Sequence, residues 1–264
     1  MYGFDYVRAA DAASARKACG DDAKYLAGGQ SLVQALKLRL AQVTTLVDLG
    51  RATDLRGIAV DANAVTLGAM TRHAEVGDSA EVRAALPVLA ELASGIGDQM
   101  VRNQGTIGGS LAHADPAACY PAAVLALNAI IITDRREIAA DDFFKGLYET
   151  ALEPGELIRQ VRFPRVAKAA YVKFKHPASR FAIVGVCVAS GTSGVRVGVT
   201  GAASCAFRAT AIEAALAKSF TPAAAQAVEL PADDMASDMH AGAEYRAALV
   251  SVMAARAVER ALSR

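Results

Sequence analysis

Two glycine-containing turns, each followed by a predicted helix, constrain this chain more than any other feature of its sequence. The first is Ala27-Gly28-Gly29-Gln30-Ser31, which follows a predicted strand and whose serine is expected to cap the next helix. The second is Gly105-Thr106-Ile107-Gly108-Gly109-Ser110, with two hydroxyl donors beside its glycines. Glycines let a backbone approach a ligand closely, and amides at a helix start present donors to an anion. Either turn alone could be a plain chain connection, but together they indicate a pyrophosphate held in a cleft between two units.

A dinucleotide-binding βαβ fold is the main alternative for the first turn, because Asp48 lies 20 residues after Gly28. That fold requires G-x-G-x-x-G, whereas the first turn offers only a Gly-Gly pair followed by Gln30 and Ser31. A P-loop is excluded because the chain contains no Gly-Lys-Ser or Gly-Lys-Thr. We therefore interpret Asp48 as a structural acid at the end of a strand.

Composition narrows the class of protein further. At 264 residues the chain exceeds a typical single domain, and its 53% of apolar residues allow a sizeable core. The net charge is +1 and tryptophan is absent, so no nucleic-acid partner is expected. The longest apolar run, 121–133, contains Asn128 and is shorter than the roughly 20 residues of a spanning helix, so no transmembrane segment is expected. The amino terminus carries acidic residues and no apolar stretch, which does not fit a secretory signal.

The four cysteines exclude one class of site. Cys19, Cys119, Cys187 and Cys205 are far apart and form no C-x-x-C pair. Iron–sulfur clusters and structural zinc sites need thiolates in close pairs, so neither is expected within this chain. Unpaired thiols fit a reducing compartment, and we expect a cytoplasmic protein.

The pattern of strands and helices predicts three units, residues 1–52, 53–168 and 169–264. The first is a small α/β unit with strands near residues 4–7, 24–27 and 45–49 and helices over 11–19 and from residue 31 onward. The second begins with a hairpin over 57–68 and ends at Phe163-Pro164. Between these ends we expect helices over 80–93 and 117–131, with a dense cluster of turns over 95–109 and a short element from residue 141. The third is predicted to be an antiparallel meander over 171–200, with one turn at 191–194, followed by amphipathic helices over 208–218, 222–228 and 243–262.

The two turns and their flanking residues resemble a known family. The segment from Arg102 to Ala118, which reads RNQGTIGGSLAHADPAA, and the first turn with Leu32 and Leu36-Lys37-Leu38-Arg39 resemble its two FAD loops. The family is the FAD-binding medium subunit of molybdenum hydroxylases, which includes the xanthine dehydrogenase and aerobic carbon monoxide dehydrogenase enzymes. The similarity covers nearly the whole chain, since residues 142–158, 175–182 and 243–257 also match, although the alanine-rich tail is unspecific.

The resemblance implies an α+β fold. Two α/β subdomains would form a para-cresol methylhydroxylase-type FAD-binding unit, and a C-terminal antiparallel sheet with helices would follow. FAD would be the only cofactor of this chain, while molybdopterin and [2Fe-2S] clusters would lie in partner subunits. The partners would be a small iron–sulfur subunit and a large molybdenum-cofactor subunit, in a heterotrimer that can dimerise.

The resemblance also implies which residues bind FAD. Pyrophosphate and the nearby ribose would contact the two loops, that is Ala27, Gly28, Gly29, Gln30, Ser31 and Leu32 with Thr106, Ile107, Gly108, Gly109 and Ser110. Ile96 would lie near the adenine, with core packing as the alternative for Ile96 and Ile158. The isoalloxazine would contact Ile158 and Phe181, and Lys173 or Lys175 would lie at its polar edge.

One position departs from the family pattern. Many relatives carry an acid, which binds hydroxyls of FAD, where this chain has Cys119. A thiol is a weak acceptor, so the contact is expected from backbone or from Asp115 instead. His113 beside the second loop is interpreted as a structural histidine rather than a catalytic one.

Three functions follow as hypotheses. The favoured one is electron transfer from iron–sulfur clusters through FAD to an external acceptor, without a catalytic acid or base in this chain. The alternative is a self-contained FAD-dependent oxidoreductase of the same fold, which would need its own substrate pocket and proton donor. A third is a non-redox module that binds another phosphate ligand. All flavin hypotheses require residues 28–31 and 106–110 to lie close enough to share one ligand.

Overall fold

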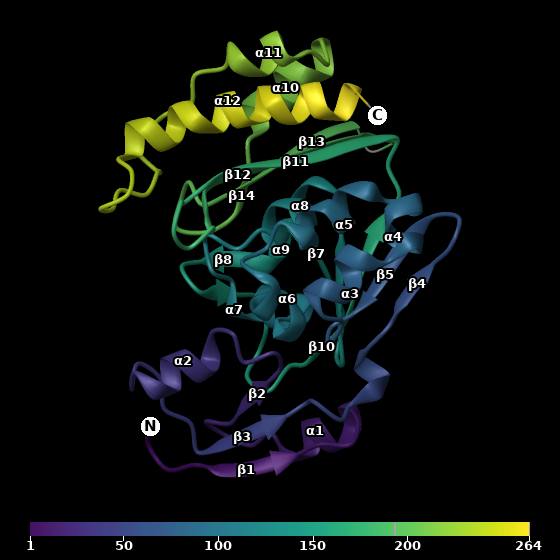
Figure 1. Ribbon diagram of the computed structural model, residues 1–264, viewed down its shortest axis with the longest axis vertical. Helices are drawn as coiled ribbons and strands as arrows, with labels where there is room; N and C mark the ends of the chain where they lie inside the picture. The colour runs from purple at the N-terminus through teal and green to yellow at the C-terminus, as the bar shows by residue number, and fades with distance from the viewer. Residues whose placement is uncertain (193, 264) are drawn as a thin grey trace.

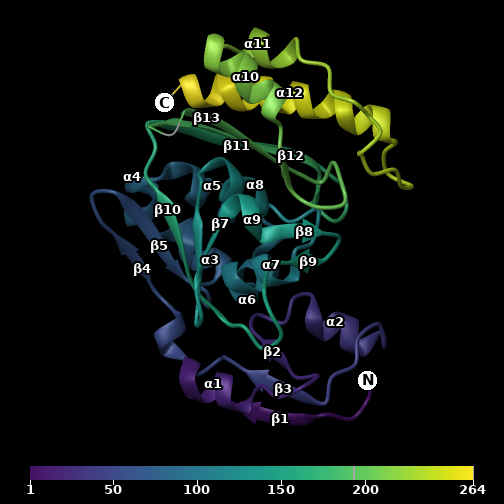
Figure 2. The same cartoon turned by 180° about the vertical axis from the view of Figure 1, so that it is seen from behind.

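The computed structural model describes residues 1–192 and 194–263, and three main sheets follow one another along its long axis (Figure 1). The N-terminus lies at one end of the molecule and the C-terminus at the other, with the largest sheet between them. The view from behind shows the same order (Figure 2). Helices pack against at least one face of each sheet. Four hydrophobic clusters result among the described residues, and the largest joins the central region to Tyr171 and Cys187 of the C-terminal sheet.

The N-terminal sheet is parallel and has the order β1-β3-β2, so its last strand is central. Asp11 starts the first helix with a capping box, in which its carboxylate accepts from the Ser14 backbone N–H at 2.7 Å. Buried Val47 and Ala15 pack on one side of the sheet and Leu36 and Leu46 on the other. The elements are β1 (Asp5–Arg8), α1 (Ala12–Ala18), β2 (Lys24–Leu26), α2 (Leu32–Lys37) and β3 (Thr45–Asp48).

Asp48 has the structural role that the sequence predicts. Its Oδ1 accepts from the Gly50 backbone N–H at 2.7 Å, and its Oδ2 accepts from Arg8 Nε at 3.0 Å and from the Tyr6 hydroxyl. The carboxylate therefore closes the turn after β3 and ties that strand to β1. A 3₁₀ turn, η1 (Thr53–Leu55), leads to the next sheet.

The central sheet is antiparallel and has the order β4-β5-β10-β6-β7. β10 pairs with both β5 and β6, although it follows the helices of this region in the chain. The strands are β4 (Ile58–Val60), β5 (Ala64–Gly68), β6 (Ile130–Thr133), β7 (Glu137–Ala139) and β10 (Ile158–Pro164), and a small hairpin consists of β8 (Phe144–Gly146) and β9 (Glu149–Thr150). The helices are α3 (His73–Asp78), α4 (Ala80–Ala85), α5 (Pro87–Ser94), α6 (Gln99–Gln104), α7 (Ile107–His113), α8 (Tyr120–Ala126) and α9 (Ala140–Phe143).

Three predictions for this region need correction. The helix expected over 80–93 is two helices, because Pro87 lacks an N–H and drives Leu86 out of the helical region. The cluster of turns expected over 95–109 contains α6, which Asp98 caps through the Val101 N–H at 2.9 Å. The helix expected over 117–131 is only α8, because residues 130–133 pair with β10 as a strand.

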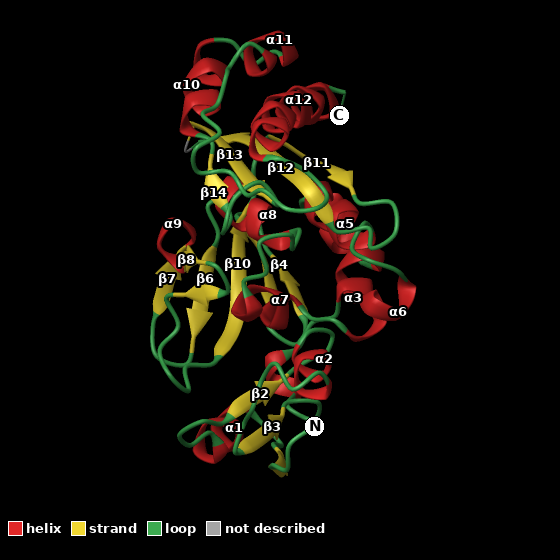
Figure 3. Cartoon of the chain, turned by 90° about the vertical axis from the view of Figure 1, so that its left-hand side faces the viewer, coloured by secondary structure: helices red, strands yellow, loops and turns green. Residues whose placement is uncertain are grey.

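The C-terminal sheet is the predicted antiparallel meander, with the order β11-β12-β13-β14. One residue of its expected turn, Ser193, lies outside the described residues. Helix α12 covers one face and α8 the other, as the side view shows (Figure 3). A side chain at Gly198 would overlap the Ala122 carbonyl oxygen, so this glycine lets β13 pack directly on α8. The elements are β11 (Lys168–Lys175), β12 (Ala182–Gly191), β13 (Gly194–Thr200), β14 (Phe207–Arg208), α10 (Thr210–Lys218), α11 (Pro222–Gln226) and α12 (Ala243–Leu262).

The expected fold class, mixed helices and sheets with a C-terminal antiparallel sheet under helices, is confirmed. The boundaries of the three units at residues 52 and 168 stay a prediction. Among residues 1–192 and 194–263, no helix combines the length and apolar character needed to cross a bilayer.

Candidate functional site

The two glycine-containing loops touch. A Cβ at Gly28 would overlap the carbonyl oxygen of Gln104 and lie 2.7 Å from the Cα of Gly105, so only glycine allows this approach. A Cβ at Gly109 would lie 3.3 Å from the Cβ of Ala27. The structure therefore places residues 27–31 and 105–110 side by side, as a shared ligand requires.

The first loop has free donors. Within the described chain, the backbone N–H groups of residues 28–31 donate to no other group, and Gly29 adopts a left-handed φ of +68°. The prediction that Ser31 caps helix α2 is wrong, because its side chain makes no capping hydrogen bond. Its hydroxyl and these amides are thus available to phosphate oxygens. Leu32, by contrast, packs with Leu26 on the core of its own sheet.

The second loop differs from the prediction that it would donate its amides. The N–H groups of Ile107 and Gly108 donate to the carbonyl oxygens of Thr71 at 3.1 Å and Ala69 at 2.8 Å. The Gly109 N–H donates to Thr106 Oγ1 at 3.2 Å, which caps helix α7, and the Ser110 N–H donates to the Thr106 carbonyl at 3.0 Å. The hydroxyls of Thr106 and Ser110 are left as its donors. Its glycines serve close packing instead.

A small apolar pocket lies where the loops meet. Small side chains form much of its wall, and the start of β10 forms its floor, where Ile158 is 4% exposed. The lining residues are Tyr25, Ala27, Leu49, Ala69, Met70, Gly108, Gly109, Ala112, Leu152, Glu156, Leu157 and Ile158.

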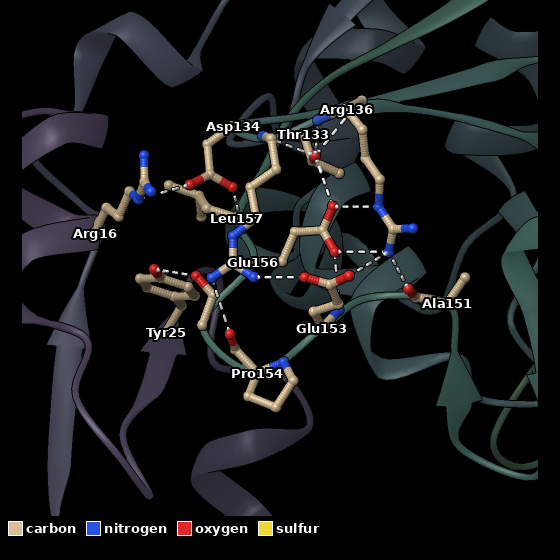
Figure 4. A network of polar contacts seen from close by, with 12 residues as sticks. Arg16, Tyr25, Thr133, Asp134, Arg136, Ala151, Glu153, Pro154, Glu156 and Leu157 are labelled. Atoms are coloured by element: carbon tan, nitrogen blue, oxygen red, sulfur yellow. Dashed lines mark hydrogen bonds and ion pairs between the residues drawn. The ribbon is translucent and has the colours of Figure 1, made fainter.

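A buried carboxylate holds the floor of this pocket (Figure 4). Glu156 Oε1 accepts from Arg136 Nε at 3.1 Å and from Thr133 Oγ1 at 2.8 Å, while Oε2 accepts from Arg136 Nη2 at 3.0 Å and the Glu153 N–H at 2.8 Å. Burial alone would raise the pKa of this carboxyl, but these hydrogen bonds outweigh it and lower the pKa to about 2. Glu156 is therefore ionised and fixes the turn 153–157.

The same turn joins the N-terminal unit to the central sheet (Figure 4). The Tyr25 hydroxyl donates to the Gly155 carbonyl at 3.0 Å, and Arg16 pairs with Asp134 at 3.3 Å. Asp134 in turn accepts from the Leu157 N–H at 2.8 Å. Tyr25 lies two residues before the start of the first loop at Ala27, so this network sets the position of that loop relative to the pocket.

A second group of predicted site residues gathers around Lys173 on β11. Its ammonium donates to the carbonyl oxygens of Gly95 and Arg180, both at 2.9 Å, and to Cys119 Sγ at 3.4 Å. Lys175 is exposed, so of the two lysines it is Lys173 that points inward. Phe181 is 50% exposed and follows Arg180 directly. Ile96 lies beside Gly95, half-buried against the central core, and its carbonyl accepts from Arg102 at 2.9 Å.

Asp115 and Cys119 connect the two groups along the chain. Asp115 accepts from the Ala117 N–H at 2.8 Å and turns the chain between α7 and α8, while Cys119 is 5% exposed at the start of α8. The ring of His113 lies 5.0 Å from that of Tyr148. Gln30 is exposed, and its side chain reaches back only to the Gly28 carbonyl.

Several residues that shape the site carry no signal in the sequence. His73 is buried behind the second loop, where Gly105 is needed because a Cβ there would lie 2.6 Å from His73 Nε2. Burial, with a smaller effect of Arg102, lowers the pKa of His73 to about 4, so this imidazole is neutral at physiological pH. No sequence pattern marked Tyr25 or Glu156 either. The hydrogen bond of Tyr25 to Gly155 spans 130 residues, and Glu156 depends on Thr133 and Arg136, which lie 23 and 20 residues before it.

Comparison with known proteins shows which proteins share this arrangement. A family model described as the FAD binding domain in molybdopterin dehydrogenase matches residues 2–166. The carbon monoxide dehydrogenase medium chain of Hydrogenophaga pseudoflava is 38% identical over 93% of this chain and 91% of its own.

Two solved structures agree over almost the full length. Reconstituted CO dehydrogenase from Oligotropha carboxidovorans has a TM-score of 0.90 at 35% identity, covering 100% of this chain and 99% of that one. Quinoline 2-oxidoreductase from Pseudomonas putida 86 also has a TM-score of 0.90, at 29% identity, with 99% and 98% covered. The fold is thus the para-cresol methylhydroxylase-type FAD-binding fold with a C-terminal sheet and helices.

Proposed function

Because this chain belongs to the family of FAD-binding medium subunits of molybdenum hydroxylases, we propose that it is the electron-transferring flavin subunit of such an enzyme. The chain is an FAD-dependent oxidoreductase subunit, and FAD is its cofactor. The observation that carries the proposal is the contact between Gly28 and the backbone of Gln104-Gly105, beside a row of amides without partners.

The two loops would share the pyrophosphate unequally. Free amides of the first loop and the Ser31 hydroxyl would bind phosphate oxygens, since hydrogen bonds to a charged acceptor are stronger than those to neutral groups. Thr106 and Ser110 would add hydroxyls from the other side. Gln30 would donate only through its backbone amide, and the remaining residues of these loops, Ala27, Leu32, Ile107, Gly108 and Gly109, would give the loops their shape rather than donate.

The rest of FAD would extend from the loops to both residue groups. Phe181 would shield the isoalloxazine and Lys173 would face its polar edge. Ile96, expected near the adenine, lies beside Gly95 in the same group as Lys173 and would contact the isoalloxazine end instead, while Ile158 would contact the part of FAD at the loop pocket. Asp115 would bind hydroxyls in place of Cys119, whose thiol is a weak acceptor. These roles fit the exposure of Phe181 and the inward position of Lys173.

When bound, FAD supplies the redox chemistry, taking electrons from iron–sulfur clusters of a small subunit and releasing them to an external acceptor. We place molybdopterin in a large subunit, and the three chains in a heterotrimer that can dimerise. Relatives are named for carbon monoxide and for quinoline, so membership of the family leaves the oxidised substrate open. A cytoplasmic location stays a prediction from the sequence.

The test is purification of a tagged chain from its own host, with identification of bound proteins and analysis for molybdenum, iron and flavin. We expect two further subunits to copurify, and the complex to contain molybdenum, iron and flavin. When this chain is separated from its partners, the flavin should leave with it, and the molybdenum and iron should stay with the other subunits. A chain that purifies alone and oxidises a substrate with its own FAD would instead identify a self-contained flavoenzyme. A folded chain that contains no flavin, both in the purified complex and when isolated, would refute FAD binding.

A further inference from the structure

The loop that joins β11 to β12 is shaped by one histidine. His176 begins the loop, and its Nδ1 accepts the backbone N–H groups of Ala178 and Ser179, both at 3.2 Å. The loop closes through backbone hydrogen bonds from His176 N–H to the Phe181 carbonyl at 2.8 Å and from Arg180 N–H to the His176 carbonyl at 2.9 Å. The imidazole thus satisfies two amides in the middle of the loop that have no other partner among the described residues.

This arrangement requires an unprotonated Nδ1. A neutral imidazole has one acceptor nitrogen, whereas both nitrogens of the protonated ring are donors. A proton on Nδ1 would point at two N–H groups and remove both hydrogen bonds. With Nδ1 as the acceptor of two N–H groups, the single proton of the neutral ring lies on Nε2.

The loop has a second side-chain support at its other end. Lys173 donates to the carbonyl of Arg180, and the backbone of Arg180 has a left-handed φ of +62°. This conformation costs energy for a residue with a side chain, and the hydrogen bonds of the loop offset that cost. Phe181 comes next, so the direction of its half-exposed ring depends on both supports.

The charged groups around His176 do not offer a proton on Nδ1 a partner. The ring of His240 packs edge to face on His176 at 4.6 Å, and Asp238 accepts from the His240 N–H and pairs with Arg246. Lys173 and Arg180, on the strand and the loop, are both cationic. Protonation would therefore break the loop without a compensating ion pair.

We propose that His176 is a positioning residue for the flavin environment, whose unprotonated Nδ1 holds the loop 176–181 so that Phe181 faces the isoalloxazine, and that acid releases this loop. The proposal deepens the proposed function and rests on it for the identity of the ring that Phe181 covers. The hydrogen bonds that close the loop are all made by residues of this chain.

The chain offers a matched pair of variants. His176→Asn places an acceptor oxygen near the position of Nδ1 but cannot gain a proton, whereas His176→Gln places its acceptor near Nε2 and leaves the two amides without a partner. In the FAD-loaded complex we expect the His176→Asn variant to keep the wild-type visible circular dichroism and flavin fluorescence. The His176→Gln variant should shift both at neutral pH.

The second part of the experiment is acidification of the same three proteins. On acidification the wild-type flavin signals should move toward those of His176→Gln, and those of His176→Asn should stay constant. A His176→Asn variant that keeps the acid response, or a His176→Gln variant with wild-type signals throughout, would overturn the proposal.

A tryptophan reporter separates this proposal from FAD binding. The chain has no tryptophan, so Phe181→Trp introduces one whose emission follows the loop in the purified full chain without flavin. We expect its emission maximum to shift on acidification, and the shift to vanish when His176→Asn is added. If the chain binds no FAD, the proposed function fails, while the reporter still decides whether His176 holds the loop.

Discussion

The contact between the two loops predicts a large effect for Gly28→Ala. The φ of Gly28 is not in the left-handed region, so alanine is acceptable to its backbone and only the contact matters. The new Cβ would lie 2.7 Å from the Cα of Gly105, about 1 Å closer than carbons pack, and it would meet backbone that no rotamer change can move. The loops must separate, at a cost of about 3 kcal/mol, the upper end of typical overpacking.

Two assays follow from that number. The melting temperature should fall by about 6–12 °C, since about 1 kcal/mol corresponds to 2–4 °C in a chain of this size. Separated loops would lose about two hydrogen bonds to the pyrophosphate, and FAD affinity should fall about 100-fold by flavin titration. Gly20→Ala is the control, because its Cβ would meet nothing within 4 Å and both values should stay unchanged. Wild-type stability and flavin content in Gly28→Ala would refute the account of the loop contact.

Three further predictions test neighbouring parts of the site. Gly109→Val should leave a folded chain that purifies without flavin, because its methyl groups would fill the space beside Ala27; normal FAD content, read from the flavin absorbance, would contradict this. Glu156→Gln should cost about 2–3 kcal/mol in urea unfolding, less than for a fully buried pair because Arg136 is 43% exposed. The pKa of Glu156 is lowered on folding, so its contribution to the free energy of unfolding is complete above about pH 4.5 and is lost as the pH falls toward 2. The Glu156→Gln variant should lack this part of the acid dependence. A variant with the wild-type dependence of stability on pH would contradict the prediction. Cys119→Asp would give the Lys173 ammonium a carboxylate partner and should raise FAD affinity about fivefold, measured by titration of the apoprotein, whereas weaker binding would exclude a role for this position in holding hydroxyls.

Local chemistry explains which parts of the fold could be predicted from the sequence. Asp11 before an alanine-rich stretch and the alternating apolar residues of 182–200 specify their elements through near neighbours, and both formed as expected. The break at Pro87 was equally local, and was missed because the alanine and leucine pattern continues across it. The strand at 130–133 was missed although its β-branched residues favour a strand and its partner β7 follows within a few residues. Only its pairing with β10, some thirty residues further on, is remote in sequence.

For the site, the sequence by itself predicted that two side-chain-poor loops could bind phosphate, because glycine lets a backbone approach a ligand closely, and the residues around them resembled one family. Only the tertiary structure decided that the loops touch through Gly28, that the first offers amides and the second hydroxyls, and that Glu156 fixes the floor between them. Hydrogen bonds such as Gly108 N–H to the Ala69 carbonyl join segments whose distance is set by packing. A donor is free or occupied only once the chain around it has folded, and no pattern of residues states that in advance.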